Sequence, residues 1–180
     1  MKKLKNSELN RISVSEFKNT SKSPIIIILD NIRSAHNVGS IFRTCDAFLI
    51  SEIILCGITA TPPNKEIRKT ALGSTESVDW RYFDNTEEVA LNLKKEGFQI
   101  ISVEQADKSL KLEKFSPKED EKYAFIFGNE IKGIDQKIID ISDNIIEIPQ
   151  FGTKHSLNVS VSAGIVLWDV FSKISFSQFD

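Results

Sequence analysis

Cysteine and histidine are scarce in this sequence. Its 180 residues include two cysteines, Cys45 and Cys56, and two histidines, with no Cys-x-x-Cys pair. Structural metal sites draw on several such ligands at short spacing, so we expect no metal site built from this chain. Both cysteines fall in segments that read as structured, and we expect reduced, buried thiols. A nucleophilic role for Cys45 is the less favoured alternative.

Long apolar runs are also missing. The longest, residues 24–29, has the length of a strand and is far shorter than the roughly 20 residues that cross a bilayer. Lys2, Lys3 and Lys5 make the N-terminus basic, but no apolar signal-peptide core follows them. We therefore expect a cytoplasmic protein that does not associate with membranes.

Neither an excess of charge nor an unusual composition marks this chain as a nucleic-acid binder. Hydrophobic residues make up 41% and charged residues 27%, the balance of one globular domain. The net charge of −2 is unevenly spread, because residues 1–73 carry 11 Lys/Arg against 6 Asp/Glu and residues 74–180 carry 12 against 19. A basic first half can steer a polyanion, although solvated lysines on an extension explain it equally well. We predict a basic N-terminal extension at 1–23 and one domain at 24–180.

Several nucleotide and hydrolase signatures are absent. Gly128 and Gly133 have the spacing of a P-loop start, but Ile134-Asp135 occupies the place of the required Lys-Ser/Thr. No Gly-x-Gly-x-x-Gly fingerprint and no Gly-x-Ser-x-Gly elbow occurs. These absences exclude P-loop nucleotide hydrolysis, dinucleotide binding of the Rossmann type and α/β-hydrolase chemistry.

Strand-like and helix-like segments alternate along the chain. The predicted strands are 25–29, 52–56, 78–83, 98–103, 123–127 and 145–148. The predicted helices are 37–50, 65–71, 86–96, 136–141 and 156–172. Such alternation is typical of an α/β fold with a parallel sheet and helices on both faces.

Three segments that follow strands have unusual chemistry: 30–43, 127–135 and 149–158. Ligands of parallel sheets bind outside the carboxyl ends of the strands, so we expect the three segments to converge on one crevice. A carboxylate, Glu130, stands between two glycines in the second segment, in a glycine-lined loop suited to a small ligand or in a plain tight turn.

The first segment leads into a helix. We expect Asn37 to cap that helix, and Gly39 to allow another backbone or a ligand to approach closely. Arg43, in the second turn, suits a phosphate or a carboxylate, although a plain surface arginine is an equal alternative.

In the third segment, Ser156 and Asn158 stand at the start of the last predicted helix. The small residues at 160–164 indicate a tight helix crossing or a close subunit contact.

The three segments resemble the motifs of the SpoU (TrmH-type) family of SPOUT RNA 2′-O-ribose methyltransferases. The family patterns are N-x-G-x-x-x-R, F-G-N-E-x-x-G and I-P-x-x-G followed by S-L-N-V-S-V. This chain has NVGSIFR, FGNEIKG and IPQFGTKHSLNVSV in the same order. The resemblance covers residues 24–170, nearly the whole chain.

The resemblance implies a fold, a cofactor and site residues. The fold is a parallel-sheet SPOUT domain with a deep C-terminal trefoil knot, and the active sites form at a homodimer interface. S-adenosylmethionine would contact Gly128, Glu130, Ile148 and Leu157. Ser156, Asn158 and Asn37 would shape the catalytic site, and Arg43 would be its catalytic residue.

The resemblance leaves the role of Arg43 and the substrate open. Arg43 either acts as a base whose pKa a neighbouring phosphate lowers, or stabilises the developing alkoxide. The compact form with its basic N-terminal extension resembles the branch of the family that modifies tRNA. The wording SLNVSV and the residue 61–74 loop favour a D-loop guanosine of the guanosine-18 type as the target. Arg33, Lys65, Arg68 and Lys69 would contact RNA phosphates. The alternatives are an rRNA or a tRNA wobble nucleotide as the target, or an RNA-binding protein without turnover.

Overall fold

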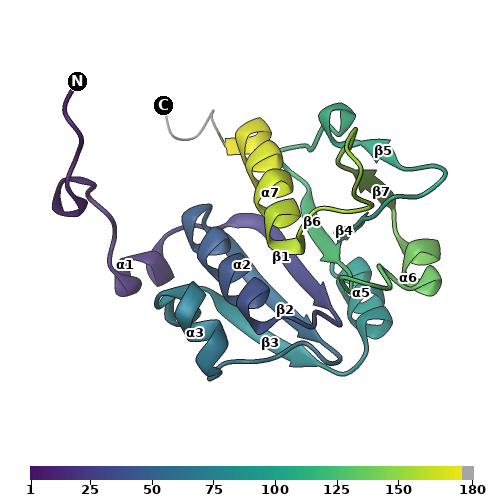
Figure 1. Ribbon diagram of the computed structural model, residues 1–180, viewed down its shortest axis with the longest axis horizontal. Helices are drawn as coiled ribbons and strands as arrows, with labels where there is room; N and C mark the ends of the chain where they lie inside the picture. Colours follow the sequence, from purple (N-terminus) through teal and green to yellow (C-terminus); the bar gives the residue numbers. More distant parts are fainter. Residues whose placement is uncertain (176–180) are drawn as a thin grey trace.

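The computed structural model describes residues 1–175, which form a seven-stranded parallel sheet with helices on both faces (Figure 1). The strand order is β3-β2-β1-β6-β4-β7-β5. The strands are β1 (Ser23–Asp30), β2 (Ile50–Cys56), β3 (Asp79–Phe83), β4 (Phe98–Val103), β5 (Leu110–Lys111), β6 (Lys122–Phe127) and β7 (Asn144–Glu147). The helices are α1 (Val14–Asn19), α2 (Ala35–Ala47), α3 (Lys65–Ala71), α4 (Ser74–Ser77), α5 (Thr86–Lys95), α6 (Gln136–Ile141) and α7 (Val159–Ser175), with short 3-10 turns η1 (Asn6–Glu8) and η2 (Leu112–Lys114). The predicted α/β class with a parallel sheet is confirmed.

Strand β1 lies inside the sheet, and its sequence explains why. Ile25, Ile27 and Leu29 belong to the core on one face, and Ile26 and Ile28 to the core on the other. All five side chains are buried, so a continuous β-branched run suits a strand that is covered on both faces.

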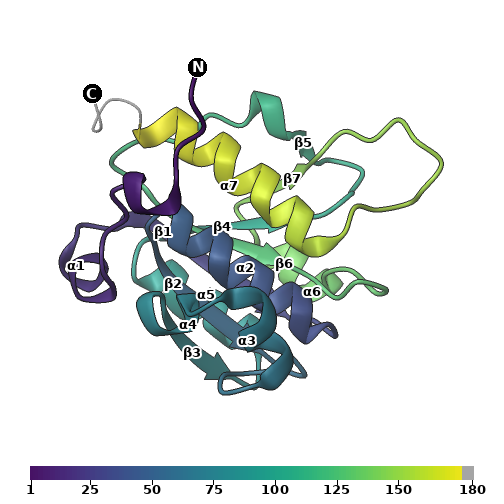
Figure 2. The same cartoon turned by 60° about the vertical axis from the view of Figure 1, so that its left-hand side comes forward.

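Two helical layers cover the sheet (Figures 1 and 2). On one face α2, α3 and α7 pack on β1 and its neighbours, with Ile41, Ile67 and Val166 in the shared core. On the other face α5 and α6 contribute Leu93 and Ile138. Because α7 comes from the far end of the chain and packs beside α2, the first and third segments of the sequence are brought to one place.

The N-terminal segment contacts the domain through α1, which packs against α4. Helix α1 begins with a capping box, in which the Ser13 hydroxyl accepts from Glu16 N and the Glu16 carboxylate accepts from Ser13 N. Its Phe17 side chain is buried in the core, whereas Leu4 and Leu9 are exposed. The last five residues of the predicted domain, 176–180, lie outside the described residues.

Two predicted helix starts were wrong. Ser34, not Asn37, caps α2, because the Ser34 hydroxyl accepts from Asn37 N at 3.3 Å. Asn37 lies in the first turn of the helix, and its side chain makes contacts outside the helix. Helix α7 begins at Val159 rather than at residue 156, because the Asn158 side-chain oxygen accepts from Ser160 N at 2.9 Å. Ser156 therefore lies in the loop before the helix.

The two cysteines are free and buried, as predicted. Burial raises the pKa of the Cys45 thiol far above its usual range, and raises that of Cys56 to about 11. Both thiols stay protonated near neutral pH, which argues against a nucleophilic Cys45.

Residues 1–175 were predicted to contain neither a membrane-spanning helix nor a metal site. No helix there is long and apolar enough to cross a bilayer. No group of three or more His, Cys, Asp or Glu side chains within that range is arranged to hold a metal ion.

Candidate functional site

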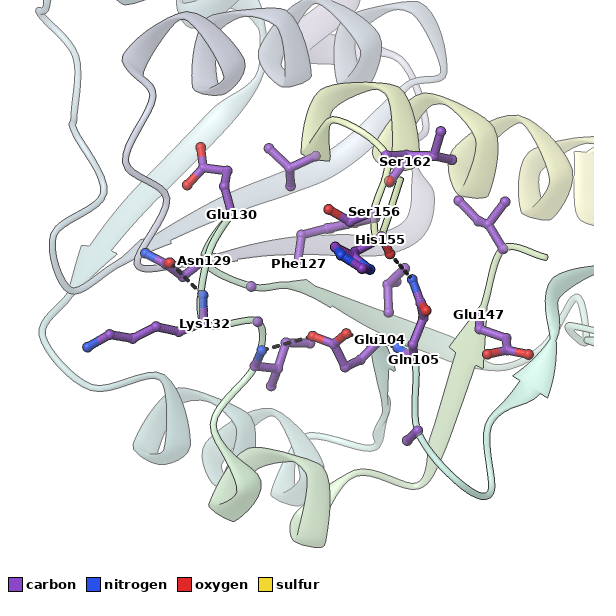
Figure 3. Close-up of a pocket in the computed structure, with 18 of the residues that line it drawn as sticks. Glu104, Gln105, Phe127, Asn129, Glu130, Lys132, Glu147, His155, Ser156 and Ser162 are labelled. Carbon is purple, nitrogen blue, oxygen red and sulfur yellow. Dashed lines mark hydrogen bonds between the residues drawn. The ribbon is translucent and has the colours of Figure 1, made fainter. Parts of the chain in front are cut away.

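A cavity of about 630 Å³ opens at the carboxyl edge of the sheet (Figure 3). Four segments line most of it: residues 103–107 after β4, residues 127–134 after β6, residues 147–150 after β7, and residues 155–157 before α7. Gly128, Glu130, Ile148, Ser156 and Leu157, which the sequence nominated, are all in this wall. The second and third segments therefore converge as predicted.

The glycine loop, residues 128–134, is folded tightly on itself. A Cβ atom on Gly128 would lie 2.6 Å from the carbonyl carbon of Gly133, so only glycine fits there. The Asn129 side-chain oxygen accepts from Ile131 N and Lys132 N, and its amide donates to Asn31 O at 2.8 Å. These contacts hold the loop against the segment after β1.

Glu130 joins the glycine loop to the start of α2. Its carboxylate accepts hydrogen bonds from Arg33 N at 2.9 Å, Ser34 N at 3.2 Å and Asn37 Nδ2 at 3.1 Å. Burial opposes ionisation of the carboxyl group, but these hydrogen bonds outweigh it and lower the pKa of Glu130. The carboxylate also lies at the positive end of the α2 dipole, which favours its charged form.

Asn37 extends this connection to the third segment. Its side-chain oxygen accepts from Asn158 Nδ2 at 3.1 Å, while its amide donates to Glu130. The Asn158 oxygen in turn accepts from Ser160 N at the start of α7. The series Glu130–Asn37–Asn158 thus joins one side chain from each of the three sequence segments.

Arg43 lies apart from the cavity. It is exposed on α2 and lines a separate hollow of about 500 Å³ together with Phe48, Lys69 and Thr70. Asn37 and Arg43 are six residues apart, which places them about 9 Å apart along the helix and on different sides of it. No residue of the first segment, 30–43, lines the cavity of the single chain, so the expected convergence of all three segments on one crevice holds there only for the second and third.

The predicted RNA contacts are exposed on the same side of the molecule as this hollow. Lys65, Arg68 and Lys69 lie on α3, with Lys69 paired to Glu66 at 2.8 Å. Helix α3 packs directly on α2 because Gly39 leaves room for it: a Cβ atom there would lie 2.3 Å from Ile67 O.

Arg33 belongs instead to the segment that leads into α2. Its backbone N–H donates to Glu130 and its side chain is exposed.

The sequence analysis did not identify the segment after β4 as part of the cavity wall. Glu104 and Gln105 follow β4 directly and line the cavity opposite Glu130 (Figure 3). Two adjacent polar residues at the end of an apolar strand, Phe98–Val103, were the available signal.

Comparison with known proteins places this chain in a family. The model of the SpoU rRNA Methylase family matches residues 24–168. The chain is 33% identical over 149 residues to the 23S rRNA (guanosine-2′-O-)-methyltransferase of Neisseria meningitidis, covering 83% of this chain and 58% of that protein. It is 32% identical over 146 residues to the tRNA (guanosine(18)-2′-O)-methyltransferase of Aquifex aeolicus, covering 81% of this chain and 67% of that protein.

Solved structures give the same result. The TrmH/SpoU tRNA modifying enzyme of A. aeolicus superposes with a TM-score of 0.78 at 27% identity, covering 89% of this chain and 81% of that one. An AdoMet-bound rRNA methyltransferase from Sinorhizobium meliloti superposes with a TM-score of 0.76 at 26% identity, covering 85% and 58%. The chain thus spans little more than half to about two thirds of the two curated relatives. On its sequence, fold and site segments, the chain belongs to the SpoU rRNA methylase family.

Proposed function

We propose that this chain is an S-adenosylmethionine-dependent RNA 2′-O-ribose methyltransferase. The observation that carries the proposal is the series Glu130–Asn37–Asn158, which joins the first family segment to the second and third, the two segments that line the cavity. The similar proteins from N. meningitidis and A. aeolicus are named as guanosine 2′-O-methyltransferases, and the similar structure from S. meliloti binds AdoMet.

The residues of the cavity fit this cofactor. Its volume lies in the range of sites for small ligands, roughly 300–1,000 Å³. Glu104, Asp107 and Glu147 are in the wall, where their carboxylates suit a ligand with a sulfonium and an ammonium group. Ile148 and Leu157 add apolar surface, and the tight glycine loop offers backbone groups at short range. The bound cofactor supplies an activated methyl group.

The protein's share of the reaction is positioning and help with one proton. A ribose 2′-hydroxyl is a poor nucleophile, so it must be held in line with the methyl group as its proton leaves. A guanidinium keeps its proton in proteins, so we assign Arg43 to stabilising the developing alkoxide. A base role assisted by a substrate phosphate is the alternative. The pH–rate profile of Arg43→Lys separates the two roles: because lysine has the lower ordinary pKa, a base role predicts a profile shifted to lower pH, whereas stabilisation by the retained charge predicts no shift.

The position of Arg43 supports a homodimer as the active unit. Val161, Ile165 and Trp168 form an exposed apolar stripe on α7, and the exposed Leu157 before the helix continues it to the cavity wall. Phe48, in the Arg43 hollow, contacts Trp168 with ring centroids 6.0 Å apart and the ring planes tilted by 46°, so stripe and hollow adjoin. A second copy packed on this stripe would bring its Arg43 to the cavity of the first.

Mixed dimers test this arrangement. Arg43→Ala and Asn158→Ala proteins, each of which we expect to be inactive alone, are dissociated, combined and reassembled. If Arg43 serves the partner's cavity, one site of each mixed dimer carries both changes and the other carries none, so activity returns. If Arg43 serves its own cavity, both sites stay defective and no activity returns.

For the substrate we propose tRNA, with the D-loop guanosine at position 18 as the target. Lys65, Arg68 and Lys69 on α3 would bind the RNA backbone beside the Arg43 hollow, and Arg33 would bind it near the cavity. The A. aeolicus relative supports tRNA and the N. meningitidis relative supports rRNA, so rRNA remains the second candidate. We also propose that the protein is cytoplasmic, because its proposed substrate is RNA.

The experiment is methyl transfer to total tRNA and to rRNA in parallel, followed by nucleoside mass spectrometry. We expect 2′-O-methylguanosine in tRNA alone. Methylation of rRNA alone would overturn the proposal that tRNA is the substrate. Cofactor binding without transfer to either RNA would favour an RNA-binding protein without turnover.

We also infer the trefoil knot of the SPOUT fold in the C-terminal part. Strands β6, β4 and β7 are neighbours out of sequence order, and residues 148–158 return the chain from β7 to α7 beside α2. We further propose that residues 1–23 act as an extension of the methyltransferase domain, since only Phe17 of their apolar side chains is buried.

A further inference from the structure

The end of β4 lies between the two loops that form the cofactor cavity. In the sheet, β4 pairs with β6 on one side and with β7 on the other. Strand β6 leads into the glycine loop, and β7 leads into the loop at residues 148–158, which is exposed from residue 150 on. Glu104, the first residue after β4, extends the pairing of β4 with β7 by donating its N–H to Ile146 O at 3.0 Å.

Glu104 contacts the glycine loop. One oxygen of its carboxylate accepts from Ile134 N at 3.0 Å, and the other accepts from Gln105 N at 2.9 Å. Gly133 has a φ of +68°, and a Cβ atom there would lie 2.4 Å from the Glu104 carboxylate. The carboxylate is thus packed against the loop backbone.

Gln105 contacts the other loop. Its side-chain amide donates to His155 O at 2.8 Å (Figure 3). Residues 150–158 are all exposed, and Figure 2 shows this loop extending from the body of the molecule. Among the described residues, this is the single hydrogen bond that ties 148–157 to the rest of the domain; the next anchor is Asn158.

His155 lines the cavity and directly precedes Ser156 and Leu157, which line it too. Fixing the His155 carbonyl therefore fixes where the next two residues enter the cavity. A loop without this anchor would have to be ordered when the ligand binds, and that ordering reduces affinity.

We propose that Gln105 is a positioning residue for the cofactor: its amide holds the 148–158 loop at the cavity wall while the adjacent Glu104 fixes the glycine loop. The identity of the ligand rests on the proposed function. The placement of the loop does not, because it follows from the hydrogen bond between Gln105 and His155 O alone.

The test variant is Gln105→Glu, which keeps the side-chain volume and removes the donor. The matched control is Gln99→Glu, the same substitution in β4 but near the amino end of the strand, away from the cavity. The probe for binding is S-adenosylhomocysteine, measured by calorimetry. Loss of one hydrogen bond predicts an affinity about 3- to 10-fold weaker for Gln105→Glu.

Two further readouts separate positioning from general destabilisation. We expect a higher KM for S-adenosylmethionine in Gln105→Glu with kcat at saturating cofactor within twofold of wild type. In the ligand-free protein, trypsin should cleave after Lys154, in the loop, several-fold faster than in wild type. Cleavage after Lys132, in the glycine loop, should be unchanged.

Unchanged affinity together with unchanged cleavage after Lys154 would overturn the proposal. Equal weakening in Gln99→Glu would also overturn it, since the effect would then come from the strand. If wild type fails to bind S-adenosylhomocysteine, the cofactor assignment fails, and the cleavage rates alone still decide whether Gln105 holds the loop.

Discussion

Glu130 offers the sharpest test of how the site is held together. Its carboxylate accepts three hydrogen bonds, from Arg33 N, Ser34 N and Asn37 Nδ2. In Glu130→Gln, one oxygen becomes an NH2 group that faces a donor, and the charge that strengthens the remaining bonds is lost. A hydrogen bond to a charged group contributes about 1.5–3 kcal/mol, so we expect a loss of about 2–3 kcal/mol in the free energy of unfolding. For a chain of this size that lowers Tm by about 4–12 °C.

The assay is thermal and urea unfolding of the wild type, Glu130→Gln and Glu147→Gln. Glu147 is the matched control, because it lines the same cavity and has no hydrogen bond or ion pair of its side chain among the described residues. We expect Glu147→Gln to melt within about 2 °C of the wild type, as surface changes do. Equal Tm values for wild type and Glu130→Gln, or equal losses in both variants, would refute the structural role of Glu130.

The same comparison has a predicted pH dependence. Folding lowers the pKa of Glu130, so its contribution to stability is complete above the unfolded value of about 4.3 and is lost as pH falls through the folded value. The stability difference between wild type and Glu130→Gln should be constant from pH 6 to 8 and shrink below about pH 4. A difference that grows on acidification would contradict the assignment.

Three further predictions concern catalysis, RNA binding and assembly. Arg43→Ala should lower kcat by about 100-fold or more while the Kd for S-adenosylhomocysteine stays within twofold, as single-turnover kinetics and calorimetry can check. Arg68→Ala should weaken RNA binding and reduce the slope of log K against log salt by about 0.7–0.9, whereas Lys95→Ala on the opposite face should not. Ile165→Asp should shift the protein to monomers in sedimentation, and Leu91→Asp, at similar exposure on α5, should leave its mass unchanged.

The layout of the sheet could be predicted from the sequence because its strands are strongly apolar. The run at 25–29 belongs to a strand buried on both faces, and the same reasoning located five of the six other strands. The two-residue strand Leu110–Lys111 was missed, since so short a segment has no periodicity to detect. Both wrong helix starts lie where two residues suit an N-cap. Before α2 these are Ser34 and Asn37, and in the structure the Asn37 side chain contacts Glu130 while Ser34 caps the helix. Before α7 they are Ser156 and Asn158, of which Asn158 accepts from Ser160 N.

The site could be predicted in part. Strand ends identified the segments around Gly128, Glu130 and Ser156, because parallel strands deliver their following residues to one edge. Contacts between side chains far apart in sequence, such as Gln105 with the His155 carbonyl, leave no pattern in one sequence. The separation of Arg43 from Asn37 was available from the helical period, since six residues do not complete two turns.

The most direct test of the account is transfer of labelled methyl from S-adenosylmethionine to unmodified tRNA, followed by alkaline hydrolysis. A methyl on the ribose 2′-oxygen blocks cleavage of the next phosphodiester, so label should appear in alkali-resistant dinucleotides, and Arg43→Ala should give none. Label in mononucleotides would mean methylation of a base and would contradict 2′-O transfer. Absence of label from both tRNA and rRNA, with cofactor bound, would contradict turnover itself.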